Sequence, residues 1–537
     1  MTSHNFISQY SSILLGPLKT YTILNSNEKI ISDGKFPILT LIISILFCGI
    51  LYKYEIMGSS ATITKIFENI TNSPSPPVYD PSSHPLPASH VYIVSAYYYP
   101  NSKSLGKNAV ALNMVVDSKN FPVDNVVYSV IGSNETHRIF LRAESQVEGV
   151  PSCRYTAVMA RTNAVENLSK FEMEISGATV EIPFKMARYT APKPVIVCIS
   201  PQFVAEQWQI FLMQVHVTHQ FGGHLHIYLT SIIESFFELM REYEKRKYLT
   251  LDYWLRMKFA EAKTPFYEPN SNVEWRNQAG AQIDCLLQYK EAAEFIAFFD
   301  MDDILFPKSF PTYLQEFRAE WQIDPNSNSI FYRRREHEFI KAKSFAGFSF
   351  KDIVSNLSSS TTVKRGKVVV KPERYNSTWI HYSYHDENRR EIESPNLVHV
   401  QRPLDENSDN EMTDVWQIDF GALNETIRSS DIEAIDRDLA KIRKSSKVMK
   451  IASKLPMTDF YLPIVFECYY KSFYGPVFDH QKGAVGCPNA DTCKLPQRKE
   501  HKCVHSDAEY SSGPHMIPFT YHFSNNSFWN WEIGCYQ

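Results

Sequence analysis

Apolar and polar residues follow two different periods along this chain, and the change of period divides it. Between Val91 and about Pro192, short runs such as VYIVSAYYY and VVYSVIG alternate with a period of two and are separated by Asn, Gly and Pro. A period of two with many Tyr and Val residues is typical of strands. Residues 91–192 are therefore predicted to form a small β-rich domain.

From residue 193 onward, short apolar runs alternate with segments of helical spacing. Repeated strand–helix units imply a parallel sheet covered by helices, with its site at the carboxyl ends of the strands. The fold class is therefore predicted to be α/β, with this domain at 193–475 and a Cys-rich, loop-rich tail at 476–537. The predicted strands are 194–200, 224–230 and 295–299, and the predicted helices are 204–221, 232–247, 274–293 and 430–447.

Residues 36–52 form an uncharged run between Lys35 and Lys53. A helix of this length covers roughly 25 Å at about 1.5 Å per residue, which is enough for a thin bilayer. A buried core helix and a cleaved signal peptide are the alternatives, but no small-residue cleavage site is evident after the run. We expect one N-terminal transmembrane signal-anchor, with 1–35 as a cytosolic tail and the Pro- and Ser-rich 53–90 as an extended stem.

Sequons and cysteines predict on which side of the membrane the chain lies. Every Asn-x-Ser/Thr triplet follows the predicted anchor, and none lies in the first 35 residues. Of nine cysteines, Cys48 lies in the anchor, which leaves an even number beyond it, as suits an oxidising lumen. We therefore expect a single-pass type II membrane protein. The candidate glycosylation sites are Asn69, Asn134, Asn167, Asn356, Asn376, Asn424 and Asn525.

Composition excludes several other classes of protein. The chain of 537 residues has 44% hydrophobic and 21% charged residues, which are ordinary values for a chain that buries a core. These values exclude a disordered, collagen-like or many-spanning membrane protein. With 55 basic against 59 acidic residues and no long basic run, no nucleic-acid partner is expected.

Three carboxylates directly follow the predicted strand 295–299. Asp300 and Asp302 are separated by one residue, and Asp303 adjoins them. At a strand's end this spacing can direct two carboxylates around one hard divalent cation, Mn²⁺ or Mg²⁺. A metal there would offset the charge of a leaving diphosphate when a nucleotide-sugar bond is cleaved. The alternative is a solvated acidic turn, but the preceding strand–helix units and Pro307 favour the metal site.

Several blocks between Pro194 and Pro403 resemble a known family. They are VCISPQF at 197–203 with Glu206 and Trp208, YEKRKYL from Tyr243, EWRNQ at 274–278 with Asp284 and Cys285, and FFDMDDILFP at 298–307. Together these blocks resemble glycosyltransferase family 92. The resemblance implies a GT-A-like, Rossmann-related fold and inverting β-1,4-galactosyl transfer from UDP-galactose, with Mn²⁺ as the metal.

The resemblance also assigns roles to single residues. The family's D-x-D motif falls on Asp300 and Asp302, with Asp303 as the adjoining acid. A later block is less similar, because this chain reads HVQR from His399 where members usually read closer to His-Tyr-Arg. We favour His399 over His381 as the last ligand of the metal or the diphosphate. The residues that the resemblance places near the nucleotide are Arg276, Gln278 and Asp284.

Two clusters suggest zinc but are better explained otherwise. Four histidines between residues 216 and 226 could meet only after a tight turn, so structural histidines are favoured over a zinc site. The cysteines of the tail, with His501 and His505, are favoured as disulfides in a lumenal protein. The two sets are His216, His219, His224 and His226, and Cys487, Cys493, Cys503 and Cys535.

These observations favour a metal-dependent glycosyltransferase of the Golgi membrane with its catalytic domain in the lumen. The expected partners are a nucleotide sugar and a glycan acceptor, with the new bond made to a fucose or galactose, for example on an N-glycan core. Glu336 and Glu338 are the candidate bases that would deprotonate the acceptor hydroxyl. The alternative is a non-catalytic, membrane-anchored glycan-binding protein that retains the fold.

Overall fold

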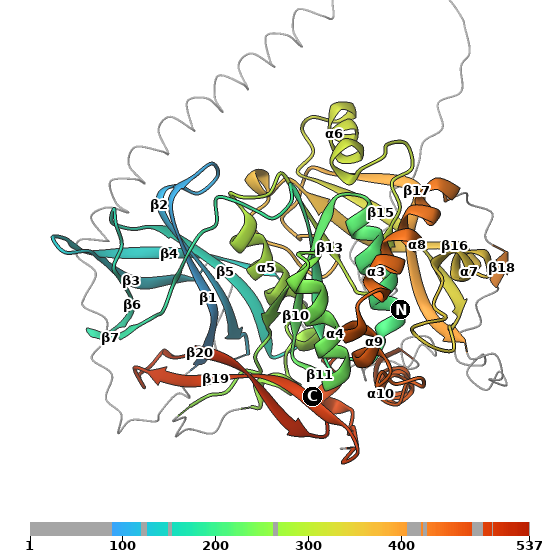
Figure 1. The fold of residues 1–537 in the computed structure, drawn as a ribbon. Coiled ribbons are helices and arrows are strands. Elements are labelled where there is room, and N and C mark those ends of the chain that lie inside the picture. The colour runs from blue at the N-terminus through green and yellow to red at the C-terminus, as the bar shows by residue number, and fades with distance from the viewer. Residues whose placement is uncertain are drawn as a thin grey trace, which may run out of the picture. The chain divides into compact units, whose positions relative to one another are not determined.

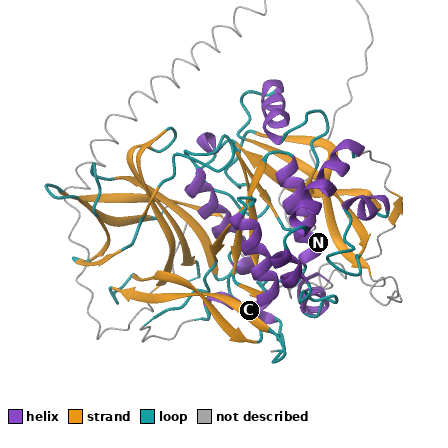
Figure 2. Ribbon diagram, in the orientation of Figure 1, coloured by secondary structure: helices purple, strands orange, loops and turns teal. Residues whose placement is uncertain are grey.

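Two β-sheets and the helices packed on them build the part of the chain that the structure describes (Figures 1 and 2). The computed structural model describes residues 89–119, 126–148, 153–260, 267–404, 420–422, 427–474, 487–496 and 498–535. All of them belong to one compact unit. The predicted anchor at 36–52 and the segments that flank it lie outside these residues. Within the described ranges, no helix is long and apolar enough to cross a membrane.

The central sheet contains the strands that the sequence predicted. Its order is β12-β10-β9-β13-β16-β15-β17-β14, with β18 paired to β16. The four strands β12, β10, β9 and β13 are parallel, as the strand–helix alternation predicted. Their bounds are β9 (Val195–Gln202), β10 (Gly223–Leu229), β12 (Leu249–Tyr253), β13 (Phe295–Phe299), β14 (Asp303–Leu305), β15 (Ser329–Ile340), β16 (Ser358–Val370), β17 (Arg389–Leu404) and β18 (Phe420–Ala422).

The second sheet contains the strands predicted between residues 91 and 192 and adds the C-terminal strands β19 and β20 to them. Its order is β11-β19-β20-β1-β2-β5-β4-β3-β6-β7, with β8 paired to β1. The strands are β1 (Ser89–Ser102), β2 (Gly106–Asp117), β3 (Val127–Ser133), β4 (Arg138–Glu148), β5 (Tyr155–Asn163), β6 (Lys170–Ile175), β7 (Ala178–Glu181), β8 (Lys185–Met186), β11 (Ser231–Ile233), β19 (Lys502–Gly513) and β20 (Phe519–Ile533).

The C-terminal tail differs from its prediction. Instead of remaining rich in loops, it contributes the long hairpin β19–β20, and β20 pairs in parallel with β1 over Ser89–Ile93. Apolar residues at alternate positions explain this pairing, since Phe519, Tyr521 and Phe523 enter the same core as Val91 and Ile93. In Figure 1 the red hairpin lies beside the blue strand β1.

Helices cover both faces of the central sheet, and the side chains of β9 show how. Val195, Val197 and Ile199 pack into the core that contains α3 and α4, whereas Ile196 and Cys198 pack into the core that contains α5. The helices are α3 (Trp208–Gln220), α4 (Glu234–Lys245), α5 (Gln278–Tyr289), α6 (Tyr313–Ile323), α7 (Phe350–Ser355), α8 (Ser429–Arg443), α9 (Ser446–Ala452) and α10 (Tyr461–Tyr469).

Helix α5 is buried along its whole length because it lies between the two sheets. One side packs on the central sheet, and the other packs on β1 and β2, where Ala279, Ile283 and Leu287 contact Tyr97 and Tyr99. Tyr97 donates a hydrogen bond to Asp284 (3.0 Å), and Tyr99 donates one to the carbonyl of Leu287 (2.6 Å). These contacts fix the helix whose first residues reach the candidate site.

The residues just before α5 have an unusual backbone. Trp275, Arg276 and Asn277 all have positive φ, between 45° and 57°, which costs a non-glycine residue about 1 kcal/mol or more. Gly280 permits this turn, because a Cβ there would lie 2.4 Å from the Asn277 side chain. The helix predicted from 274 therefore begins four residues later, after a strained left-handed segment.

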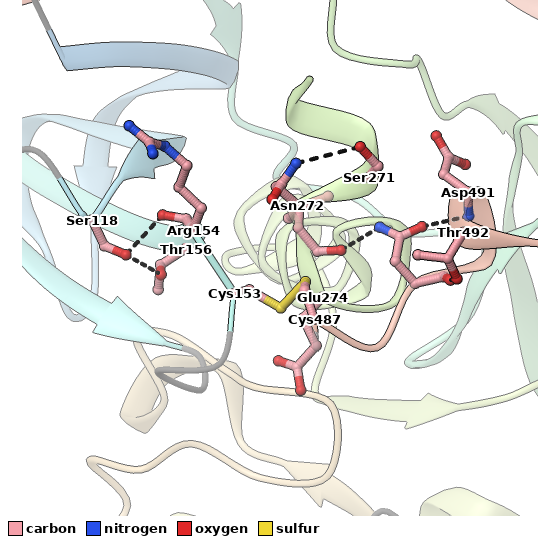
Figure 3. Close-up of a disulfide and its surroundings, with 12 residues drawn as sticks. Ser118, Cys153, Arg154, Thr156, Ser271, Asn272, Glu274, Cys487, Asp491 and Thr492 are labelled. Carbon is pink, nitrogen blue, oxygen red and sulfur yellow. Dashed lines mark hydrogen bonds between the residues drawn. A yellow bond between two sulfur atoms is a disulfide. The ribbon is translucent and has the colours of Figure 1, made fainter. Parts of the chain in front are cut away.

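A C-terminal segment holds this strained turn in place, and Figure 3 shows the disulfide at Cys487, where this segment begins. The carbonyl of Pro488 accepts a hydrogen bond from Trp275 N (2.8 Å), and Asp491 pairs with Arg276 (3.1 Å). Cys487 forms a disulfide with Cys153 of the β-rich domain. The tail that looked independent in the sequence is thus tied to both domains.

All eight cysteines of the described residues are paired, as the even count predicted. Cys503–Cys535 joins two cysteines of the tail, and Cys198–Cys285 ties α5 to β9. The other two bridges are Cys153–Cys487 and Cys468–Cys493. This arrangement suits an oxidising compartment.

Thiol labelling of the unfolded, unreduced protein should find none of these eight cysteines free. Replacing Cys198 and Cys285 together by Ala should lower the free energy of unfolding by about 2–4 kcal/mol, because the bridge restricts the unfolded chain. Denaturant titration of both proteins measures the difference. Peptide mapping that pairs these cysteines with other partners would contradict the assignment.

The buried carboxyl of Glu274 gives a second test of this fold, because it should make the stability of the protein depend on pH. Burial raises the pKa of its carboxyl to about 8, although the hydrogen bond from Trp379 Nε1 (2.6 Å) opposes the shift. A folded-state pKa above the unfolded value of about 4.3 means that the folded protein holds the extra proton. Its contribution to stability is therefore present at low pH and is lost as pH rises between these two values. Glu274→Gln should raise the Tm at pH 8.5 and leave it nearly unchanged at pH 4, as measured by calorimetry. Equal changes in Tm at pH 8.5 and pH 4 would contradict the raised pKa of Glu274.

Candidate active site

The parallel strands β9 and β13 end at a cavity of about 300 Å³, which we call the metal cavity. The chain from Ser200 to Gln207 forms one side of it, and Asp300 and Asp302 project from the end of β13. Residues of α10 also line it. This is the edge of the sheet at which the sequence predicted the site.

Asp300 is held by two fixed donors. Gln278 Nε2, at the start of α5, donates a hydrogen bond to Asp300 Oδ1 (2.7 Å). Lys367 Nζ, from β16, pairs with Asp300 Oδ2 (2.8 Å) and is itself fully buried. The predicted nucleotide residue Gln278 and the predicted metal residue Asp300 therefore touch, and Lys367 is a member of the site that the sequence did not reveal.

Asp302, Asp303 and His399 form the one group of potential metal ligands found among the described residues. One ligand atom from each lies within 4.8 Å of the others. His399 comes from β17, which pairs with β14 so that His399 lies opposite Asp303. His399 Nε2 lies 3.7 Å from Asp302 Oδ2. Three of the four residues that the sequence proposed as ligands therefore meet in the folded chain, whereas Asp300 is not part of this group.

Asp303 orients this histidine. It is fully buried and lies 2.8 Å from His399 Nδ1 and 3.2 Å from Arg334 Nη1. Burial alone would raise its pKa, but the Arg334 guanidinium and His399 hold the pKa of Asp303 well below its usual range. An ionised carboxylate only accepts hydrogen bonds, so His399 Nδ1 carries the hydrogen that faces Asp303, and Nε2 faces Asp302. Metal-binding histidines are commonly fixed in this way.

Glu336 joins the group from β15, opposite His399 in the parallel pair β15–β17. Its Oε2 lies 3.4 Å from His399 Nε2, and its Oε1 lies 3.5 Å from Arg334 Nη2. Both oxygens are buried without a hydrogen-bond donor. Burial opposes ionisation, yet His399 and Arg334 lower the pKa of Glu336 to about 2.

The charges of this group fit a divalent cation. The group contains four carboxylates and only two cationic side chains, Arg334 and Lys367, so ionised carboxylates would leave an excess of two negative charges. The carboxylates are Asp300, Asp302, Asp303 and Glu336. Desolvation, and then repulsion from Asp303 and Asp300, raise the pKa of Asp302, with His399 opposing the shift. Both oxygens of Glu336, one of these four carboxylates, have no hydrogen-bond donor. A cation with oxygen and imidazole ligands would satisfy all three features.

The structure separates the three predicted nucleotide residues. Gln278 lines the metal cavity, but Arg276 and Asp284 line a different cavity. Arg276 pairs with Asp491 (3.1 Å), and burial lowers its pKa to about 10. Asp284 accepts hydrogen bonds from two tyrosines, including Tyr228 (2.5 Å).

The other predicted residues have varied positions. His381 lines the metal cavity and lies 3.0 Å from the carbonyl of Gly366. Neither Glu336 nor Glu338 is among the residues that line the cavity, and Glu338 is half-buried further along β15. Their role as bases stays a prediction.

Helix α10 is a part of the site that the sequence did not predict. Glu206 holds its N-terminus, because Glu206 Oε1 accepts hydrogen bonds from the backbone nitrogens of Phe460 (2.9 Å), Tyr461 (2.7 Å) and Leu462 (3.0 Å). Glu206 belongs to a block that carries the family resemblance, which is the one signal that could have revealed it. Aromatic residues of α10, such as Tyr469, line the cavity.

The histidines discounted as a zinc site take structural roles. His216 bonds with Asp438 (2.8 Å) and Tyr243 (2.8 Å), and His226 bonds with Tyr289 (3.1 Å). His224 bonds with Thr250 (2.9 Å), and the His219 ring stacks on Tyr248.

The sequons that the structure describes lie at least partly on the surface. Asn167 and Asn356 are exposed, and Asn134, Asn376 and Asn525 are half-buried. Asn69 and Asn424 lie outside the described residues, so glycosylation stays a prediction at all of these positions.

Solved structures show only distant similarity. Staphylococcus aureus TarS has a TM-score of 0.23 and 10% identity over 38% of this chain and 60% of that chain. The mannosyltransferase PcManGT from Pyrobaculum calidifontis, solved with GDP-Man and Mn²⁺, has a TM-score of 0.22 and 15% identity over 40% of this chain and 59% of that chain. These scores are too low to carry an argument about this chain.

Sequence relatives are much closer. One glycosyltransferase family 92 protein of Caenorhabditis elegans is 56% identical over 500 residues, which cover 93% of this chain and 98% of that protein. Another from the same organism is 40% identical over 83% of this chain and 90% of that protein. The family model itself matches residues 193–443, which include β9, β13 and the whole of β17 with His399. The chain therefore belongs to glycosyltransferase family 92.

Proposed function

We propose that this glycosyltransferase is a metal-dependent, inverting enzyme with a GT-A-like fold. It transfers galactose from UDP-galactose in β-1,4 linkage to a fucose or galactose of a glycan, such as an N-glycan core. Mn²⁺ or Mg²⁺ is its metal. The observation that carries the proposal is the meeting of Asp302, Asp303 and His399 at the end of a parallel strand, beside a cavity of about 300 Å³.

The residues present fit a metal by the chemistry of their donors. Asp302 and His399 Nε2 are the proposed ligands that face the cavity, with Glu336 as a buried carboxylate beside them. Asp303 and Arg334 set the orientation of the histidine. A divalent cation bound there would stabilise the negative charge of the departing nucleoside diphosphate.

The remaining residues of the cavity position the donor. Gln278 and Lys367 fix Asp300 in one orientation, and a fixed carboxylate loses little conformational freedom when the donor binds. The rings of Trp275 and Tyr469 narrow the cavity and keep water from the reacting carbon. Inversion requires a single displacement, in which a base takes the proton of the acceptor hydroxyl while that oxygen forms the new glycosidic bond.

Removing the metal ligands should abolish transfer while the protein still folds. Asp302→Asn and His399→Gln keep side-chain size but weaken the proposed site, and each should lower kcat/KM about 10³-fold, or about 4 kcal/mol. The dissociation constant for Mn²⁺ should rise in both, as measured by calorimetry. Asp300→Asn should lose most of its activity too. Asp303→Asn should lose less activity but lower the Tm, because it leaves Arg334 buried without its full partner.

Asp507→Asn is the matched control. Asp507 lies on β19, away from the metal cavity, and pairs with the exposed Lys258 (2.9 Å). It should keep full activity and full affinity for Mn²⁺. Transfer from UDP-galactose that survives EDTA and the change Asp302→Asn would refute the metal mechanism. If the enzyme transfers sugar from another nucleotide sugar and not from UDP-galactose, the proposed donor is wrong.

We also propose a Golgi location with the catalytic domain in the lumen and residues 36–52 as the anchor. The four disulfides support an oxidising compartment. Digestion with an N-glycosidase should therefore lower the apparent mass of the full-length protein. Complete degradation by protease added to sealed microsomes would contradict this orientation.

A further inference from the structure

A second cavity lies on the other side of the segment that precedes α5. Its volume is about 490 Å³, within the range of roughly 300–1,000 Å³ that is usual for ligand sites. Its lining includes β1 at its register shift between Ile93 and Ser95, residues 252–257 from the end of β12 onward, and residues 523–527 of β20. Irregular pairing of this kind is frequent beside functional sites. The β-rich domain thus forms one wall of a cavity shared with the glycosyltransferase domain.

The backbone from Trp275 to Gln278 separates the two cavities. Trp275 and Gln278 line the metal cavity, whereas Arg276 and Asn277 line the second one. The Arg276 guanidinium lies 4.0 Å from the ring centre of Phe203, which faces the metal cavity. A ligand in the second cavity would therefore lie beside the metal cavity and outside it.

The charges of the second cavity favour a neutral ligand. Its described lining holds equal numbers of carboxylates and cationic side chains, and several pair with each other. Asp491 binds both Arg256 (2.6 Å) and Arg276 (3.1 Å). A diphosphate would find no excess of positive charge here. The charged lining residues are Asp252, Asp284, Asp491, Lys185, Arg256 and Arg276.

Several residues that line this cavity have buried polar atoms without a hydrogen-bond partner. Thr230 Oγ1 and Arg276 Nε are among these atoms, and both residues are more than nine-tenths buried. Buried polar groups are nearly always hydrogen-bonded in native proteins. Asp252 adds a carboxylate whose side chain is 24% exposed. This wall suits a ligand with many hydroxyl groups.

Aromatic rings continue from the second cavity onto the surface of β20. Tyr253 lines the cavity, and its ring centre lies 4.3 Å from that of Trp529. Phe237 lies 5.0 Å from Trp529 and 6.1 Å from Trp531, which is 52% exposed. Aromatic faces pack against the apolar CH groups of a sugar ring, while carboxylates and amides bind its hydroxyls.

We propose that the second cavity binds a neutral sugar of the acceptor glycan, and that the strip formed by Tyr253, Trp529 and Trp531 supports the sugars that follow. That this ligand is the acceptor of the reaction rests on the proposed function. The binding of a neutral oligosaccharide in the second cavity does not. The shared wall at Trp275–Gln278 places this glycan next to the donor. The β-rich domain and the hairpin β19–β20 then select the acceptor.

Calorimetry on the full-length protein without metal or donor tests this binding. The probes are free neutral oligosaccharides: N-glycan cores with and without fucose, and chitotriose. Trp531→Ala removes an exposed ring, and Asp252→Asn keeps the shape of its side chain. Each should weaken the best probe about 5-fold, as expected for the loss of one stacking or hydrogen-bonding contact. The affinity for UDP with Mn²⁺ should stay unchanged.

Phe140→Ala is the matched control for Trp531, because Phe140 on β4 is 71% exposed and lies outside the strip. It should leave oligosaccharide binding unchanged. The proposal is wrong if no probe binds the unaltered protein, if both variants bind as tightly as the unaltered protein, or if Asp252→Asn instead weakens UDP. Hydrolysis of UDP-galactose with Mn²⁺ and no acceptor reports separately on the proposed function, so the two can fail independently.

Discussion

The complete burial of α5 between two sheets is the constraint on which the site depends. A helix that packs on the central sheet at one side and on β1 and β2 at the other cannot shift without opening two cores. Its first residue, Gln278, therefore meets Asp300 at a fixed position. The strained turn before it persists because tertiary contacts such as the Trp254–Arg276 hydrogen bond (2.9 Å) hold it. Strain of this kind is typical of functional sites.

Electrostatics at the metal cavity depends on strands that are far apart in the sequence. Arg334 stabilises Asp303 in its ionised form, and Asp303 in turn holds His399. Buried charges of one sign are costly unless partners or a cation offset them. Glu336 receives only part of this compensation, because its oxygens lie near Arg334 and His399 but accept no hydrogen bond.

Local patterns in the sequence predicted much of this arrangement, and non-local pairings explain the rest. The buried strand before Asp300 and the alternation of strands and helices were sufficient to place the acidic motif at the edge of a parallel sheet. Glu336 was expected as a base, and its position beside His399 follows from the pairing of β15 with β17, which no local period records. Lys367 was missed for the same reason. The helix expected from 274 began later because three residues adopt positive φ, which periodicity does not reveal.

The parallel pairing of β20 with β1 also governs when the protein can finish folding. During synthesis β2 follows β1 directly, yet β20, the partner of the other edge over Ser89–Ile93, emerges much later. Until then this part of β1 has an open edge, which invites pairing with other chains. The bridge from Cys153 to Cys487 spans 334 residues and must also wait. A chain that lacks β20 would thus be prone to aggregation, even though every residue of the metal cavity is still encoded.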